Sequence, residues 1–331
     1  MQEIISIPHR VCESTCYVNG LEDVLTWKGG SYIDFLLSVV GGMASFAYLK
    51  FKAAKPPCMV YWGTNPKYLL RNLENIIGFS QIVSEGKSFK TTFPQIKEFI
   101  DKNEPVMAGA LDMYYLHYYP DIYNKNHVPI HYVLVVGYDE ERQIIFVHDC
   151  SSKDVQEVPY AEFEKALDVK VPGMSKKNTF RVFKLPREIP SEFEVARKGF
   201  KAKAQQMLKP PVKLFGIPAM RNLAKEIVSW NRRDCFEHLI TYATTPPVLP
   251  SSFEHSDGMR FAQADVLEDL GRKYKVNEWI DASERFRRSG NLIIELCKTA
   301  MKRDSQKCPV FITQIAGIEE EAYCLLRDAS C

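Results

Sequence analysis

The stretch of sequence that decides the fold is IHYVLVVGYDEERQIIFVHDC, residues 130–150. Two runs of apolar and β-branched residues flank the polar segment DEER, and this pattern is typical of a β-hairpin. Neither run alternates between apolar and polar residues, because Leu134 and Val135 stand side by side. Strands of this kind are buried on both sides, so we expect both faces of the hairpin to be covered.

The hairpin also determines which polar side chains lie close together. A three-residue loop, residues 139–141, would pair Tyr138 with Arg142 and place His131 opposite Asp149. Any odd loop length in simple register puts these two side chains on one face, whereas an even length puts them on opposite faces. Side chains paired across a sheet have Cβ atoms ~5 Å apart, so the carboxylate of Asp149 would orient the imidazole of His131.

The segments around the hairpin divide the chain into two parts. A helical pattern and then a strand pattern occupy residues 92–116. The segment KLPREIPSEFE, residues 184–194, is rich in proline and charge, as a linker would be, and helical patterns dominate beyond it. We therefore predict an α+β domain over residues 1–185 and a mainly α-helical domain over residues 191–331.

Composition argues against several classes of protein. The chain has 331 residues and a net charge of +2, which gives no case for binding nucleic acid. The most apolar segment, residues 32–49, is interrupted by Asp34 and two glycines, so a membrane span of ~20 residues is not expected. The first residues lack the basic start and apolar run of a signal peptide. Nine irregularly spaced cysteines do not suggest a secreted disulfide framework, and we expect a cytoplasmic protein with reduced thiols.

Two cysteines near the N-terminus, Cys12 and Cys16, are candidates for a nucleophile. The spacing of Tyr17, Leu21 and Val24 indicates a helix, and we expect Cys12 at its start. The free N–H groups and the helix dipole at that position favour a thiolate and would help to bind an oxyanion. Cys16 would lie one turn further into the helix and pack in the apolar core, where burial makes a thiol inert.

An early cysteine at a helix start, with His and Asp on neighbouring strands, has the composition of a catalytic triad. Cys12 would be the nucleophile, His131 its base, and Asp149 would hold the proton on the other ring nitrogen. Simpler interpretations stay open on these residues alone. A histidine on a strand is more often a core or surface residue, an aspartate at a strand end often forms a turn or a cap, and cysteines are commonly just buried.

The sequence gives no sign of a metal site or of a bound cofactor. The two early cysteines lack a second compact Cys/His pair that would complete a zinc site. His127 and His131 are four residues apart, but Pro129 prevents a regular helix between them. No phosphate loop and no dinucleotide fingerprint are present.

The motifs HRVCESTCYVN, HYVLVVGYD and HDC, in this order, resemble the family of butirosin biosynthesis protein H. The resemblance implies a papain-like N-terminal domain with the cysteine protease fold, and an appended helical domain with a GIPAM-containing helix, here residues 216–230. The catalytic pattern of the family falls on Cys12, His131 and Asp149. The candidates for substrate binding, taken from the family motifs and from the aromatic stretch YYLHYYP, are Ser14, Asp112, Tyr114 and Tyr115.

Two positions depart from the family pattern. Cys150 follows the triad aspartate where proline is common. Ser6 stands where the related double-glycine peptidases have a glutamine, six residues before the cysteine. The backbone N–H of Cys12 would be one donor of an oxyanion hole, and the second donor is not identified.

The resemblance implies a cysteine acyltransferase of natural-product biosynthesis, such as antibiotic biosynthesis. An acyl or peptidyl carrier protein bearing phosphopantetheine would deliver an acyl group as a thioester to Cys12. A small amine would then accept the acyl group as an amide, with no further cofactor. The fold includes peptidases, so a cysteine peptidase or amidohydrolase with the same triad is the second interpretation. An inactive papain-like binding protein in a biosynthetic complex is the third.

One basic segment, residues 195–225, contains no Asp or Glu. Carrier proteins are usually acidic, so this segment is a candidate docking surface, and an ordinary solvated basic face is the alternative. Its cations are Arg197, Lys198, Lys201, Lys203, Lys209, Lys213, Arg221 and Lys225.

Overall fold

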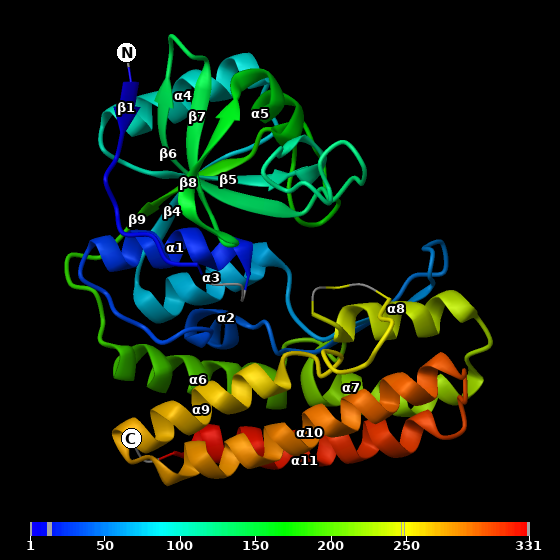
Figure 1. Ribbon diagram of the computed structural model, residues 1–331. Helices are drawn as coiled ribbons and strands as arrows, with labels where there is room; N and C mark the ends of the chain where they lie inside the picture. The colour runs from blue at the N-terminus through cyan, green and yellow to red at the C-terminus, as the bar shows by residue number, and fades with distance from the viewer. Residues whose placement is uncertain (1, 12–14, 246, 248, 330–331) are drawn as a thin grey trace. The chain divides into compact units, whose positions relative to one another are not determined.

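The computed structural model describes residues 2–11, 15–245, 247 and 249–329 of the chain (Figure 1). The chain forms two compact units. Unit 1 contains Met1–Tyr32 and Ile77–Ser191, and unit 2 contains Ile33–Ile76 and Glu192–Cys331. A large antiparallel sheet lies in unit 1 and helices dominate unit 2, so the predicted α+β class with a helical C-terminal region is confirmed.

The first part of the chain is not one continuous domain, because Ile33–Ile76 belongs to unit 2, whereas the predicted boundaries put it in the first domain. Helix α2 (Leu36–Gly41) is completely buried and packs against α6 (Glu192–Leu208). The packing is so close that a Cβ atom on Gly199 would lie 2.5 Å from the Cβ of Val40. The apolar character of this segment therefore comes from packing between helices of unit 2.

The sheet of unit 1 is antiparallel throughout its described strands. Its order is β4-β9-β5-β6-β7-β8. Strand β5 pairs with the first half of β6, and β1 pairs with the last residues of β6. Every residue of β6 and β7, the predicted hairpin, is buried, which confirms the expectation from their apolar runs. The strands are β1 (Gln2–Ile4), β4 (Ser80–Ser84), β5 (Val106–Leu111), β6 (His131–Asp139), β7 (Ile144–Asp149), β8 (Ser152–Pro159) and β9 (Phe180–Lys184).

Helices cover both faces of this sheet (Figure 1). On one face lies α1 (Cys16–Trp27), and a Cβ on its Gly20 would lie 3.2 Å from the Cβ of Leu134 in β6. On the other face, Val133 and Val135 of β6 belong to an apolar core that includes residues of α4 and α5. Successive residues of β6 thus face different layers, because side chains alternate along a strand. The covering elements there are α4 (Phe89–Asp101), α5 (Tyr160–Leu167) and the 3₁₀ helix η1 (Met113–Tyr115).

The register of the hairpin differs from the expected one. Tyr138 pairs with Ile145, not with Arg142, because residues 140–143 form a four-residue loop. The carboxylate of Asp139 accepts hydrogen bonds from the backbone N–H groups of Glu141 and Arg142, which stabilises a tight turn.

An even loop alone would separate His131 from Asp149, but a bulge between Val135 and Gly137 shifts the ladder by one residue. Beyond the bulge Leu134 pairs with His148. The next pair in this register is Val133 with Asp149. Since His131 is two residues from Val133, it lies on the same face of the sheet as Asp149, in a diagonal position.

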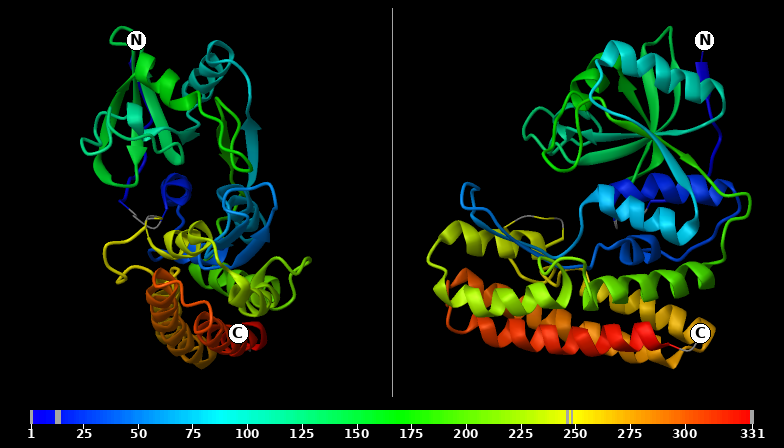
Figure 2. Two further views of the ribbon diagram at one scale, coloured as in Figure 1. Left: turned by 90° about the vertical axis from the view of Figure 1, so that its right-hand side faces the viewer. Right: turned by 180° about the vertical axis from the view of Figure 1, so that it is seen from behind.

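Unit 2 is mainly helical in its described residues, with a two-stranded sheet beside the helices. Figure 2 shows α10 and α11 lying side by side. The predicted helix at 216–230 falls in α7 with η2. Besides α2 and α6, the elements are β2 (Ala47–Lys50), β3 (Cys58–Tyr61), α3 (Pro66–Ile77), α7 (Gly216–Glu226), η2 (Ile227–Ser229), α8 (Arg233–Ala243), α9 (Arg260–Tyr274), α10 (Asn277–Met301) and α11 (Cys308–Asp328).

The helical part of unit 2 holds an ion pair that is completely buried. The guanidinium of Arg260 in α9 contacts the carboxylate of Glu319 in α11 at 2.8 Å, and neither side chain is exposed. The hydroxyl of Ser289 in α10 donates to the same carboxylate at 2.6 Å. Among the described residues, no helix combines the length and the apolar character that crossing a membrane requires.

Candidate active site

Helix α1 begins at Cys16, preceded by Thr15 in an extended conformation. The expectation that this helix begins at Cys12 is wrong, because the helical spacing starts only at Tyr17 and the backbone of Thr15 is not helical. Cys12 itself lies outside the described residues, as does Ser14, so their predicted roles stay predictions. Cys16 occupies the helix start that was predicted for the nucleophile.

The thiol of Cys16 lies beside the start of β6, a central strand of the sheet. Its Sγ is 3.9 Å from the carbonyl oxygen of Ile130, and Cys16 is only partly buried. Cys16 is also near enough to His131 for its charge to raise the pKa of the ring. Cys16 therefore does not pack in the apolar core as expected from its assumed place one turn inside the helix. The N-terminal end of a helix carries a partial positive charge, so this end of α1 favours a nearby anion.

His131 and Asp149 are in contact and both are buried. Nε2 of His131 lies 2.7 Å from Oδ2 of Asp149. Burial disfavours the charged imidazole, but the negative charges of Asp149 and Cys16 outweigh it and raise the pKa of His131 to about 10. Burial also disfavours a carboxylate, but His131 and the hydrogen bonds to Asp149 lower the pKa of this group to about 2. The pair is thus an imidazolium and a carboxylate over a wide pH range. Nε2 of the ring contacts Asp149, and Nδ1 is the other ring nitrogen.

Two tyrosines complete the surroundings of Asp149. The hydroxyl of Tyr118 donates to Oδ2 at 2.7 Å and that of Tyr119 to Oδ1 at 2.6 Å. Ser151 in turn donates to the hydroxyl of Tyr119 at 2.7 Å. Burial and the nearby carboxylate raise the pKa of both tyrosines, so they stay protonated donors. Sequence analysis missed this role, because nothing in the spacing of YYLHYYP connects it with an aspartate 30 residues further along the chain.

Asp112, a predicted substrate-binding residue, has its carboxylate directed into its own loop. It is buried and accepts hydrogen bonds from the N–H groups of Tyr114 at 3.1 Å and Val128 at 2.9 Å. Its other oxygen lies 2.6 Å from Nδ1 of His127, whose ring stacks on that of Tyr114 at 4.2 Å. These contacts shape the loop that carries the two tyrosines bound to Asp149. Tyr114 and Tyr115, the other predicted residues of this loop, are partly exposed.

Two groups among the described residues offer three donor atoms to a metal ion, with the atoms of each group within 4.8 Å of one another. One is the contacting pair His131 and Asp149 together with Cys150. The other is made of His9, Asp23 and His148. This second group was not predicted from the sequence, because Asp23 and His148 are 125 residues apart in the chain.

The basic segment 195–225 forms α6, α7 and the turn between them in unit 2. Lys203 is not part of its surface, because its side chain is buried and donates to the carbonyl of Val39 at 2.8 Å and to Gln263 at 2.7 Å. Burial lowers the pKa of Lys203 well below its usual value. The other cations predicted for this surface are exposed.

Comparison with known proteins gives two family matches and one relative. Residues 15–150 match "Butirosin biosynthesis protein H, N-terminal", and residues 161–246 match "Domain of unknown function (DUF4872)". The first match begins just before Cys16 and includes the contacting pair on β6 and β7. The chain is 27% identical to the uncharacterized protein YobF of Bacillus subtilis (strain 168) over 152 residues, which is 46% of this chain and 47% of YobF. The alignment thus covers about half the length of that relative. Residues 15–150 of the chain therefore form an N-terminal domain of the family of butirosin biosynthesis protein H, and residues 161–246 form a domain of the second family.

Proposed function

We propose that this protein is a cysteine acyltransferase that moves an acyl group from a carrier-protein thioester to an amine and forms an amide. The observation that carries the proposal is the thiol of Cys16 at the first residue of α1, beside the buried pair of His131 and Asp149. The family match supports it, because the family takes its name from a protein of butirosin biosynthesis. The proposed partners are therefore an acyl or peptidyl carrier protein and a small amine.

We assign the role of nucleophile to Cys16 in place of Cys12. The thiol of Cys16 interacts with His131, and the N-terminal family match includes Cys16 but not Cys12. Cys16 also lies where the backbone N–H groups at the start of α1 lower the cost of negative charge. The same N–H groups would stabilise the oxyanion that forms when the thiolate attacks an acyl carbon.

The proposed reaction has two steps in which His131 carries the proton. In the first, the thiolate of Cys16, paired with the imidazolium of His131, attacks the thioester carbon, and His131 gives the proton on Nδ1 to the departing pantetheine thiolate, which leaves as a thiol. In the second, the amine attacks the acyl group on Cys16, His131 takes the amine proton, and the Cys16 thiolate leaves. Asp149 keeps the ring oriented through Nε2 and stabilises its positive charge, as the third member of a triad does.

The other residues have supporting roles in this proposal. Tyr118 and Tyr119 hold the carboxylate of Asp149 in place. Tyr114 and Tyr115 are proposed to contact the substrate from the loop that Asp112 shapes. The exposed cations of α6 and α7 are the proposed docking surface for an acidic carrier protein, without Lys203.

Intact mass measured after incubation with an acyl-pantetheine thioester tests the proposal. We expect an acyl adduct on the wild type and on Cys12→Ala, and none on Cys16→Ala. The opposite result for the two variants would restore Cys12 as the nucleophile. An adduct that survives in water and leaves when an amine is added supports acyl transfer. Rapid hydrolysis would instead support the peptidase or amidohydrolase, and a folded wild type without any adduct would support the inactive binding protein.

A further inference from the structure

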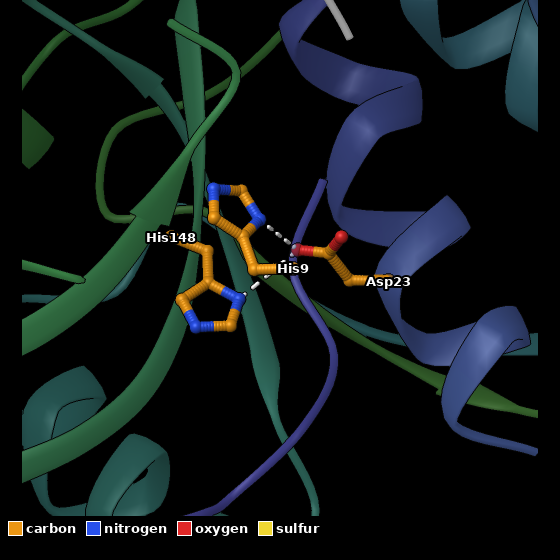
Figure 3. Close-up of side chains that lie close together, drawn as sticks. All are labelled: His9, Asp23 and His148. Carbon is orange, nitrogen blue, oxygen red and sulfur yellow. Dashed lines mark hydrogen bonds and ion pairs between the residues drawn. The ribbon is translucent and has the colours of Figure 1, made fainter. Parts of the chain in front are cut away.

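Three polar side chains from separate parts of unit 1 meet between α1 and the sheet (Figure 3). His9 comes from the segment that follows β1, Asp23 from α1 and His148 from β7. Nδ1 of His9 lies 2.7 Å from Oδ2 of Asp23, and Nδ1 of His148 lies 3.0 Å from the same oxygen. The two imidazole rings are stacked with their centroids 4.2 Å apart. Two ring nitrogens thus converge on one carboxylate oxygen.

This group is enclosed by protein. The side chains of His9, Asp23 and His148 are only 6%, 2% and 5% exposed. A carboxylate removed from water in this way is costly unless a positive charge balances it. A cation bound between the three side chains would supply that charge at the point where their donor atoms meet.

The surrounding contacts leave these three atoms available as ligands. Nε2 of His9 lies 2.8 Å from the carbonyl oxygen of Ser152, an acceptor, so Nε2 carries a proton. In a neutral imidazole Nδ1 then holds the lone pair that binds a metal. The backbone N–H of Arg10 donates to Oδ1 of Asp23 at 3.3 Å, which leaves Oδ2 facing the histidines. Such hydrogen bonds from ligand side chains to the surrounding backbone are typical of metal sites.

We propose that Nδ1 of His9, Nδ1 of His148 and Oδ2 of Asp23 bind a divalent transition-metal ion, and that Zn²⁺ is the ion that fits this donor set. Two imidazoles and one carboxylate suit zinc, with distances of about 2.0–2.2 Å to each ligand atom. Ligands at tetrahedral angles are then roughly 3.3 Å apart. The two nitrogen–oxygen distances therefore need to open by only about half an ångström. A water or another small ligand would complete the coordination.

The proposed ion would have a structural role. Asp23 is on the helix that begins with Cys16, and His148 is adjacent to Asp149 in β7. The ion would join the helix, the strand and the N-terminal segment without contacting the thiol or its base. Metal binding is thus independent of the acyl transfer proposed above, and either proposal can fail without the other.

Titration of the full chain with ZnCl₂ tests this inference, after treatment with a chelator and its removal. We expect one Zn²⁺ per chain by calorimetry and a higher unfolding temperature with the ion. His148→Gln and Asp23→Asn should bind it at least about tenfold more weakly. His117→Gln changes an exposed histidine and is the matched control, with the affinity of the wild type. Cys150→Ser should also keep that affinity, which separates this site from the group around His131.

Long-range ¹H–¹⁵N spectra of the histidine rings keep the test decisive if the variants do not fold. Zn²⁺ should shift the Nδ1 signals of two histidines in the wild type, and the ring signals of His117 should not move. Three results would overturn the inference: no zinc binding by the chelator-treated wild type, unchanged affinity in folded His148→Gln, or loss of binding in Cys150→Ser.

Discussion

Replacing Asp149 by asparagine is expected to remove much of the pH dependence of stability between pH 6.5 and 10. The charges of Asp149 and Cys16 overcome the effect of burial and raise the pKa of His131 to about 10 in the folded chain. The pKa of an unfolded histidine is about 6.5. Because the folded value is the higher one, the stabilisation is fully present below about pH 6.5 and is lost as the pH rises through about 10.

The size of the effect follows from these two values. They differ by about 3.5, which corresponds to about 5 kcal/mol of unfolding free energy as an upper bound. Asp149 touches the ring at 2.7 Å and is almost completely buried, so it accounts for the larger share. The wild type loses unfolding free energy between pH 6.5 and 10, and we expect Asp149→Asn to make this loss smaller by about 3 kcal/mol.

Urea unfolding at pH 6.5, 8 and 9.5 measures this difference. Asp112→Asn is a matched control, because Asp112 contacts the ring of His127 at 2.6 Å but His127 is 63% exposed. Solvent screens that pair, so Asp112→Asn should keep the pH dependence of the wild type. If the wild type and Asp149→Asn lose the same free energy over this range, the charge coupling assigned to His131 is wrong.

Three further predictions concern single side chains. Tyr119→Phe removes a hydrogen bond to the buried carboxylate of Asp149 and should lower the free energy of unfolding at pH 7 by about 1–3 kcal/mol in urea titrations. Glu319→Gln leaves the buried guanidinium of Arg260 without its counter-charge, so it should cost about 3–5 kcal/mol by the same measurement. Lys198→Glu should slow association with an acidic carrier protein about twofold to tenfold at low salt, measured by stopped-flow fluorescence.

Each of these predictions has a direct check. Tyr123→Phe alters a tyrosine of the same loop and should stay within about 0.5 kcal/mol of the wild type. If Tyr119→Phe and Tyr123→Phe lower the free energy of unfolding equally, the hydrogen bond from Tyr119 does not stabilise the protein. A Glu319→Gln protein as stable as the wild type would mean that the guanidinium reaches water. For Lys198→Glu, the difference in rate should vanish near 1 M salt, and a difference that persists there would contradict an electrostatic origin.

The hairpin could be predicted from the sequence because its residues are apolar without alternation, and such runs occur in strands covered on both sides. Its register could not. The four-residue turn and the bulge between Val135 and Gly137 each shift the pairing, and their combined effect depends on local hydrogen bonds. The assignment of Ile33–Ile76 to unit 2 was also out of reach, since it depends on contacts with α6 and α7 far along the chain.

In the candidate site, the pairing of a strand histidine with a strand aspartate was accessible from the sequence, because both lie on one hairpin. The start of α1 was predicted four residues too early, at Cys12, since the apolar spacing gives no limit on the N-terminal side. Tyr118 and Tyr119 reach Asp149 through the folding of a loop, and no periodic pattern describes such a contact.

Strand β6 divides the core of unit 1 into two compartments that can change separately. Leu134 faces the helix that begins with Cys16, while Val133 and Val135 face the layer with α4 and α5. Substitutions on the first side act on the position of the thiol, and those on the second side act on the layer that surrounds its base and carboxylate. When two mutations lie far apart and share no contacts, their effects on the free energy of unfolding are additive. Mutations in one compartment can therefore move the thiol of Cys16 while the pair of His131 and Asp149 in the other stays as it is.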